Sequence, residues 1–162
     1  MSIRVGSGFD VHRFAAPEER RSLMLMGILV PFDRGLMGHS DADVMLHALM
    51  DALLGAAGLG DIGQHFPDTD AAYKDSDSAF LLEGIMSELR NYGWRVENAD
   101  VCLIGERPKI GPHRQAMRER IAPILGIKIE ALNVKATTTE KLGFTGRGEG
   151  LAAQAVVLIE RV

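Results

Sequence analysis

Residues 40–60, "SDADVMLHALMDALLGAAGLG", are the stretch that decides the fold, and the other elements are placed around it. The run is rich in Met, Leu and Ala, which favour a helix. Ser40 is of a residue type that caps helix starts, and aspartates occupy the first turn. Gly58 and Gly60 are typical of a helix end. We therefore expect a helix over these residues.

Strand and helix patterns lie on both sides of this helix. The sequence predicts strands at 2–13, 23–31, 94–104, about 131–137 and about 151–161, and further helices at about 76–92 and 112–125. The resulting order, β-β-α-α-β-α-β-β, indicates an α+β fold with a single mixed β-sheet covered by helices on one face, a ferredoxin-like two-layer sandwich. A length of 162 residues fits a single domain spanning 1–162.

Composition and charge exclude several classes of protein. The chain is 46% hydrophobic and 25% charged, as a soluble globular protein is, and no apolar run approaches the roughly 20 residues of a membrane span. Its net charge of −4, with scattered basic residues, argues against nucleic-acid binding. The start, "MSIRVGSGFDVH", enters strand-like alternation directly, and the single cysteine, Cys102, leaves no internal disulfide. We expect a cytoplasmic protein with no membrane and no nucleic-acid partner.

Three residues on two predicted elements suggest a metal site. Asp10 and His12 in "GFDVH" are two positions apart on a strand, so both side chains leave the same face. On the helix, Asp43, His47 and Asp51 follow at four-residue spacing along one stripe. A carboxylate and two imidazoles match three-ligand zinc with an open fourth position, and an aspartate of the stripe is expected to orient His47. Spacing alone leaves open a surface Asp–His pair and a hydrogen-bonded core histidine.

A second candidate site lies in "VKATTTEKLGFTGRGEG", residues 134–150. Thr137 and Glu140 have the spacing of a capping box, which predicts a short helical turn. A helix start presents free N–H groups to anions, and Glu140 is suited to hold a hard cation against phosphate oxygens. Capping without ligand binding is the alternative. The segment also belongs to one of two long irregular stretches, 61–75 and 138–150, and loops of this length tend to be functional.

Several motifs carry a resemblance to a known family. "GFDVH", "HSDADVMLHALMDALLGAAGLGDIG", "FPDTD", "RPK" and "NVKATTTEKLGFTGRGEG" occur in one order and spacing over essentially the whole chain. In this the sequence resembles the 2-C-methyl-D-erythritol 2,4-cyclodiphosphate synthases of the non-mevalonate isoprenoid pathway. The resemblance implies conversion of 4-diphosphocytidyl-2-C-methyl-D-erythritol 2-phosphate to the cyclic diphosphate and CMP. The resemblance further implies that the 2-phosphate attacks the β-phosphorus with the help of metal ions, so we expect a cyclising phosphorus–oxygen lyase.

The resemblance also implies which residues act. Asp10, His12 and His47 would hold Zn²⁺, and Glu140 would hold Mg²⁺ or Mn²⁺ with the substrate phosphates. We expect His39 and Thr138 to be the catalytic residues, donating hydrogen bonds to the transition state. The implied substrate-binding residues are Asp10, Val11, His12, His39, Ser40, Asp61, Ile62, Gly63, Phe66, Pro67, Asp68, Thr69, Asp70, Gly105, Glu106, Arg107, Pro108, Lys109, Ile110, Gly111, Thr137, Thr138, Thr139, Glu140, Phe144 and Arg147.

Partners follow from the same resemblance. The family implies a homotrimer whose active sites lie between subunits, a cytidine diphosphate-linked substrate, and an isoprenoid diphosphate in a central channel near Phe144 and Arg147. Two alternative functions share these residues. One is a zinc-dependent phosphoester hydrolase that uses metal-bound water. The other is a non-catalytic isoprenoid-diphosphate sensor that uses Arg147, against which the zinc ligands argue, because a sensor does not need them.

Overall fold

The computed structural model describes residues 2–162, and its largest element is a four-stranded mixed sheet. The strands are β1 (Ile3–Arg13), β4 (Trp94–Ile104), β5 (Leu132–Thr137) and β6 (Gly150–Arg161), in the spatial order β1-β6-β4-β5. β6 pairs antiparallel with β1 and β4, whereas β4 and β5 are parallel. This arrangement confirms the predicted α+β fold with a mixed sheet.

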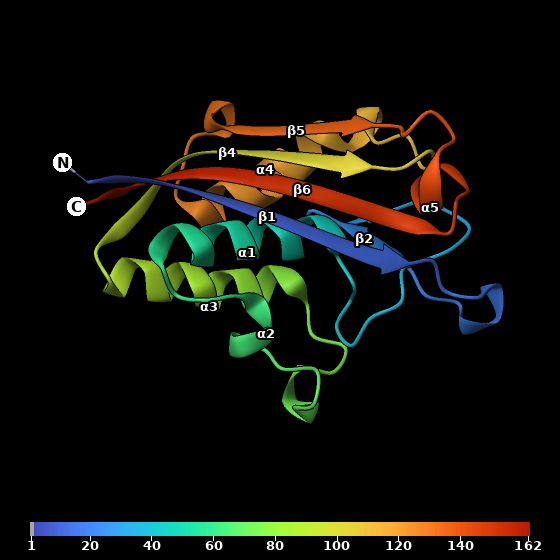
Figure 1. Cartoon of the computed structure of the whole chain (residues 1–162), viewed down its shortest axis with the longest axis horizontal. Helices are drawn as coiled ribbons and strands as arrows, with labels where there is room; N and C mark the ends of the chain where they lie inside the picture. Colours follow the sequence, from blue (N-terminus) through green and yellow to red (C-terminus); the bar gives the residue numbers. More distant parts are fainter. Residues whose placement is uncertain (1) are drawn as a thin grey trace.

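Three helices cover one face of this sheet, as predicted (Figure 1). The helix α1 (Val44–Ala57) lies along β1 and β6, α4 (Arg114–Leu125) packs on β5, and α3 (Ser78–Asn91) packs against α1 and α4. The buried apolar side chains of sheet and helices form one continuous core. None of the helices within residues 2–162 has both the length and the hydrophobicity to cross a membrane.

In the part of the chain that the structure describes, residues 2–162, the other face of the sheet carries no helix. Side chains of β1 alternate between the two faces, so every second residue points away from α1. On that outer side Ile3, Val5, Phe9 and Val11 are between 41% and 65% exposed. Exposed apolar side chains that lie in a row on an uncovered sheet face are typical of an interaction surface.

The inner face of β1 has glycines where α1 lies closest. A Cβ atom at Gly8 would overlap the carbonyl oxygen of Ala48, and one at Gly6 would overlap that of Ala52. The absence of side chains therefore lets the backbone of α1 rest directly on β1. This close approach brings α1 next to the side chains that end β1.

We predict that Gly8→Ala destabilises the protein, because the new methyl group has to push α1 away from the sheet. The expected loss in the free energy of unfolding is about 1–3 kcal/mol, the usual cost of overpacking. Gly55→Ala is a matched control on α1, since a Cβ there meets no atom within 4 Å. It should stabilise the helix by up to about 1 kcal/mol. Urea unfolding of both variants measures the difference, and equal effects would contradict the packing argument.

The start of α1 differs from the prediction. The helix begins at Val44 and its N-cap is Asp43, whose carboxylate accepts from the amide of Leu46 over 3.1 Å, so Ser40 is not the cap. The same carboxylate accepts from the amides of Met26 and Gly27 at 3.0 and 2.8 Å. Asp43 therefore joins the helix start to the preceding turn, which the sequence pattern does not show. The helix end at Gly58 agrees with the prediction.

The predicted strand at 23–31 is wrong, because the chain turns back in the middle of it. β2 (Leu23–Leu25) and β3 (Ile28–Val30) form a separate two-stranded hairpin around Met26 and Gly27, both at positive φ. Apart from the start of α1, which lies four residues after the predicted one, the other predicted elements lie within three residues of their observed bounds. The shorter helices are η1 (Pro17–Glu19), α2 (Ile62–His65), η2 (Ala71–Tyr73), η3 (Gly111–His113), η4 (Ile129–Ala131) and α5 (Gly143–Gly146).

Candidate metal centre and adjoining pocket

Three side chains meet where the end of β1 passes α1. Asp10 Oδ2 lies 2.9 Å from His12 Nε2 and 3.2 Å from His47 Nδ1, and the two imidazole nitrogens are 3.0 Å apart. Asp10, His12 and His47, the metal triad, are the group of acidic and histidine side chains within residues 2–162 whose ligand atoms converge in this way. Ligand atoms around tetrahedral zinc stand about 3.3 Å apart, given metal–ligand distances near 2.0–2.1 Å. The donor set therefore fits zinc.

Charge at the triad is set by the close contact of its members. Partial burial of Asp10 disfavours its ionised form and so raises its pKa. Hydrogen bonds and charge from His12 and His47 have a larger, opposite effect and hold the pKa of Asp10 well below its ordinary value. Burial likewise opposes the charged form of His12, and the hydrogen bond and charge of Asp10 outweigh it, so the pKa of His12 is raised. In the metal-free site the His12 ring therefore stays protonated to higher pH than a free imidazole, and a cation that binds in that range has to displace the proton.

The remaining ring nitrogens of the two histidines have their own partners. His12 Nδ1 lies 2.6 Å from the carbonyl oxygen of Met37, so it donates there and leaves Nε2 to the triad. His47 Nε2 lies 3.1 Å from the hydroxyl oxygens of Ser40 and Ser78. The prediction that an aspartate of the helix stripe orients His47 is therefore wrong. Asp43 caps the helix, and the carboxylate of Asp51 accepts from the amide of Ile62 over 2.8 Å.

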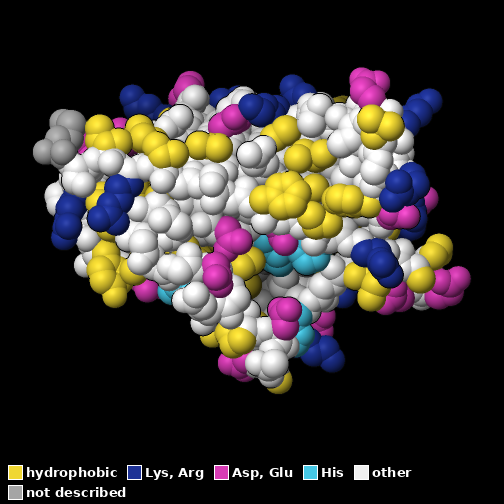
Figure 2. Space-filling view, in the orientation of Figure 1, with side chains coloured by type: hydrophobic (Ala, Val, Ile, Leu, Met, Phe, Trp, Pro, Cys, Tyr) yellow, Lys and Arg dark blue, Asp and Glu magenta, His cyan; other side chains and the backbone are white. Residues whose placement is uncertain are grey.

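A pocket of about 420 Å³ opens beside the triad. In Figure 2 histidine side chains lie at a hollow in the surface, with acidic side chains next to them. Its walls come from the end of β1, the segment before α1, α1 itself, residues 62–73 and the first turn of α3. The predicted residues that line it are Asp10, His12, His39, Ser40, His47, Ile62, Gly63, Phe66, Pro67, Asp68 and Thr69. The pocket thus joins a metal site to a cavity large enough for a small organic ligand.

The whole chain matches one protein family. Residues 3–160 match the family model described as the YgbB family. The chain is 55% identical over 159 residues to the 2-C-methyl-D-erythritol 2,4-cyclodiphosphate synthase of Bacillus cytotoxicus, which covers 98% of this chain and 99% of the relative. The protein of the same name from Xanthomonas axonopodis is 56% identical over 161 residues, 99% of this chain and 95% of the relative. The chain belongs to this cyclodiphosphate synthase family.

Solved structures of the synthase family share the fold. A 2C-methyl-D-erythritol-2,4-cyclodiphosphate synthase structure superposes with a TM-score of 0.87 at 38% identity, covering 97% of this chain and 100% of that chain. The bifunctional IspDF of Campylobacter jejuni gives 0.93 at 45% identity, covering 99% of this chain, which spans only 43% of that protein. The Plasmodium falciparum IspF structure, a CDP complex, gives 0.85 at 30% identity, covering 99% of this chain and 97% of that chain.

The segments that the synthase resemblance assigns to the nucleotide lie elsewhere in the chain. The loop 105–111 and the threonine turn, residues 137–141, follow the neighbouring parallel strands β4 and β5. They are held together by Glu106, whose Oε1 accepts from the amides of Thr139 and Lys141 at 3.3 and 3.2 Å. Glu106 is therefore a structural link between the two segments.

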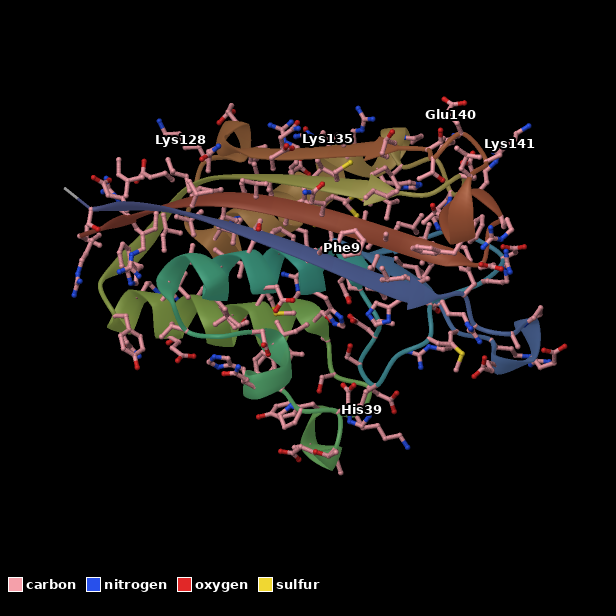
Figure 3. All side chains as sticks on the ribbon, viewed as in Figure 1. Phe9, His39, Lys128, Lys135, Glu140 and Lys141 are labelled. Carbon is pink, nitrogen blue, oxygen red and sulfur yellow. The ribbon has the colours of Figure 1, made fainter. Side chains whose placement is uncertain are left out.

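The structure does not bring these segments to the metal triad of the same chain. Within residues 2–162, no residue of 105–111 or 137–141 lines the pocket beside the triad. Figure 3 shows Glu140 beside α5, at the β5 edge of the sheet, and His39 on the opposite side, below α1. The two predicted catalytic residues, His39 and Thr138, thus belong to different regions of one subunit.

The threonine turn differs from its predicted conformation. Thr137 is the last residue of β5, and Glu140 and Lys141 adopt left-handed φ values of 52° and 63°. The next helix, α5, begins only at Gly143 with Leu142 as N-cap, so the predicted capping box at Thr137 is wrong. The amides of this turn already have partners within the chain: those of Thr139 and Lys141 donate to Glu106 Oε1, and that of Glu140 donates to Thr138 Oγ1 over 3.3 Å.

Other predicted residues are placed less directly. The side chain of Val11 lies on the outer sheet face, because neighbours on a strand alternate. Asp61 and Asp70 are N-caps of α2 and η2, and Asp70 also accepts from His39 Nε2 through its carbonyl oxygen over 3.1 Å. Ile110 is buried in the core, and its carbonyl oxygen accepts from the amide of His113 over 2.9 Å. Within the residues described, Phe144 and Arg147 are exposed near α5, where Arg147 pairs with Glu149.

Sequence patterns missed several residues of the site. Gly38, Met50, Tyr73 and Leu81 also line the pocket. Gly38 has no room for a side chain, since a Cβ would lie 2.9 Å from the Cβ of Ala42 and 3.1 Å from the His12 ring. Tyr73 was interpreted as a core or subunit contact, although it lies in the long irregular stretch 61–75; it packs edge-on against Phe66 with ring centroids 5.1 Å apart. Met50 and Leu81 carry no sequence signal that separates them from core residues.

Proposed function

We propose that this chain converts 4-diphosphocytidyl-2-C-methyl-D-erythritol 2-phosphate to 2-C-methyl-D-erythritol 2,4-cyclodiphosphate and CMP, as a phosphorus–oxygen lyase of non-mevalonate isoprenoid biosynthesis. The observation that carries the proposal is the metal triad, its ligand atoms within 3.2 Å of one another, in a chain 55% identical to a named synthase. The family match over residues 3–160 supports a single synthase domain, and we place the enzyme in the cytoplasm.

The residues of the triad would hold Zn²⁺ through Asp10 Oδ2, His12 Nε2 and His47 Nδ1. When bound, the ion supplies Lewis acidity, which polarises a phosphoryl oxygen and offsets the charge of the reacting phosphates. Glu140 lies in the exposed threonine turn, and its carboxylate would hold Mg²⁺ or Mn²⁺ with the substrate phosphates. Both assignments place a cation where the substrate is most negative.

The chain has no need of a general base in this reaction. The second pKa of a phosphate monoester is near ~6, so the 2-phosphate is already an ionised nucleophile at neutral pH. The work left to the protein is to fold a flexible substrate and to meet its charge. His39 at the pocket rim and Thr138 in the threonine turn are the proposed donors to the transition state. The walls of the pocket, including Phe66 and Tyr73, orient the methylerythritol part.

We propose a homotrimer in which each active site lies between two subunits. One chain separates the triad and its pocket from the loop 105–111 and the threonine turn, so a second copy has to supply the missing half. The exposed apolar residues of the outer sheet face offer the surface on which copies meet. CDP complexes of similar structures support binding of the cytidine portion at this shared site. Phe144 and Arg147 would then face a central channel that takes an isoprenoid diphosphate.

Product analysis tests the proposed reaction. With Zn²⁺, Mg²⁺ and 4-diphosphocytidyl-2-C-methyl-D-erythritol 2-phosphate, the purified chain is expected to release CMP and to form a cyclic diphosphate. ³¹P NMR identifies the phosphorus-containing products. A hydrolase would yield CDP or linear phosphates from the same substrate. A sensor would leave the substrate unchanged. Either of these results would overturn the proposed activity.

We predict that zinc affinity rises with pH. The pKa of His12 is raised above that of a free imidazole, so the metal-free ring stays protonated to higher pH, and in that range zinc has to displace the proton. Below that pKa the affinity should increase about tenfold per pH unit, and above it the affinity should level off. Asp10 adds no pH dependence there, because its lowered pKa keeps it ionised. Titration against a chelating dye between about pH 5.5 and 8 measures the slope, and a flat profile would contradict the prediction.

A further inference from the structure

We propose that Ser78 and Asp41 are positioning residues of the metal site, which hold His47 with a hydrogen on Nε2 and the lone pair of Nδ1 toward the metal. The inference rests on the proposed metal site and concerns residues outside it. Ser78 lies outside the motifs that carry the family resemblance, and Asp41 lies within one of them but has no role assigned to it there. The argument starts from the buried hydroxyl behind His47.

Ser78 can serve His47 only as a hydrogen-bond acceptor. Its side chain is fully buried at the start of α3, and its Oγ lies 3.1 Å from His47 Nε2. The Ser78 hydroxyl donates its hydrogen to Asp41 Oδ1 over 2.5 Å. A hydroxyl has one hydrogen, so what faces His47 is an oxygen lone pair. His47 Nε2 therefore has to carry the hydrogen of that contact.

Asp41 is itself fixed in place. Its Oδ2 accepts from the amide of Ser78 over 3.0 Å, and its Oδ1 also accepts from the amide of Asp43 over 3.2 Å. Its own amide donates to the carbonyl oxygen of Ser76 over 3.1 Å. The Asp41 carboxylate thus connects the segment before α1 to the start of α3. It accepts hydrogen bonds from two backbone amides and from the Ser78 hydroxyl. The direction of the Ser78 hydroxyl follows from this arrangement.

Ser40 supports the same orientation but does not determine it. Its Oγ accepts from the amide of Ala42 over 3.2 Å and also lies 3.1 Å from His47 Nε2. No carboxylate takes the hydrogen of this hydroxyl within the described residues, so Ser40 can either donate or accept. Ser78 is the group that decides, because its hydrogen is already engaged.

The consequence concerns the nitrogen that faces the metal. With the hydrogen on Nε2, the neutral ring of His47 presents an Nδ1 lone pair next to Asp10 and His12, at 3.2 and 3.0 Å. The other tautomer would place a hydrogen where the ion binds. Outer partners of ligating histidines contribute about 10–100-fold in metal affinity. Here the carboxylate of Asp41 acts on His47 through the hydroxyl of Ser78. Ser78 lies on α3, 31 residues after His47 in the chain.

Ser78→Ala tests the proposal, with Asp77→Ala as its matched control. Asp77 is the N-cap of α3 and accepts from the amide of Ala79 over 2.8 Å, so its loss weakens the same helix start. Zinc affinity is measured by competition with a chelating dye. Ser78→Ala is expected to weaken zinc binding about 10–100-fold, whereas Asp77→Ala should retain wild-type affinity. Equal zinc affinity in Ser78→Ala and wild type, or equal weakening in both variants, would overturn the inference.

A second measurement has a readout in the wild-type protein, which does not depend on how well a variant folds. In the zinc-loaded wild-type protein with ¹⁵N-labelled histidine, the Nε2–H of His47 should be visible and slow to exchange with water. Asp41→Asn, which weakens the acceptor for the Ser78 hydroxyl, should accelerate that exchange and lower zinc affinity together. Fast exchange in the wild-type protein would also overturn the inference. If the wild-type protein binds no zinc, the proposed metal site fails instead, so the two failures are distinguishable.

Discussion

His47→Ala is expected to remove zinc from the purified protein and to abolish turnover. His47 supplies one of three protein ligands, and two remaining ligands do not hold zinc in a catalytic site. We expect metal content to fall from one zinc per chain to none, and the rate of CMP release to drop by about a thousandfold or more. Elemental analysis after dialysis gives the first quantity, and a nucleotide assay gives the second.

His65→Ala is the matched control for this variant. His65 is also partly buried, and its ring contacts the carbonyl oxygen of Leu59 at 2.9 Å and the carboxylate of Glu88 at 3.3 Å. Its removal therefore costs hydrogen bonds of a similar kind outside the triad. It should retain zinc and turnover, and circular dichroism should show both variants folded. Zinc at wild-type stoichiometry in His47→Ala would refute the ligand assignment.

Mixing two inactive variants is expected to restore activity. His47→Ala lacks the metal triad but keeps the threonine turn, whereas Glu140→Ala has the opposite defect. If each active site takes its triad from one subunit and its threonine turn from the neighbour, mixed trimers contain sites with both halves intact. Random assembly from equal amounts should restore about a quarter of the wild-type sites.

The mixing experiment distinguishes shared from self-contained sites. The two variants are unfolded together and refolded, and CMP release is compared with that of each variant refolded alone. A site complete within one chain would gain nothing from mixing, because each chain would still carry its own defect. The zinc content of the mixture should be half that of the wild type in either case, which verifies that both variants are present.

Local patterns were sufficient for much of the fold. The strand at 94–104 and the helices near 76–92 and 112–125 follow from hydrophobic periodicity and glycine ends, which act within a few residues. The hairpin at 23–31 was not predicted, because its apolar residues continue through Met26 and Gly27 without a polar break. The start of α1 was misplaced because Ser40 was expected to be the N-cap. Asp43, which was chosen as a candidate partner of His47, is the N-cap instead.

The candidate metal site was also predictable in part from patterns that act within a few residues. A two-residue spacing on a strand is enough to align Asp10 and His12, and the motif order identifies His47 by resemblance. The partner of His47 Nε2 was not predictable, since Asp41 and Ser78 are 37 residues apart and meet only when α3 docks. The conformation of the threonine turn was also missed, because Thr-x-x-Glu spacing describes a helix start equally well.

By itself, the sequence determined the element order, the alternation that places Asp10 and His12 on one face, and membership of the synthase family. Only the tertiary structure decided that His47 reaches them, because that distance depends on glycine backbone at Gly6 and Gly8 meeting α1. It also decided that the threonine turn lies away from the pocket of its own chain. Short-range patterns encode which way a side chain points, whereas the separation of two elements depends on how everything between them packs.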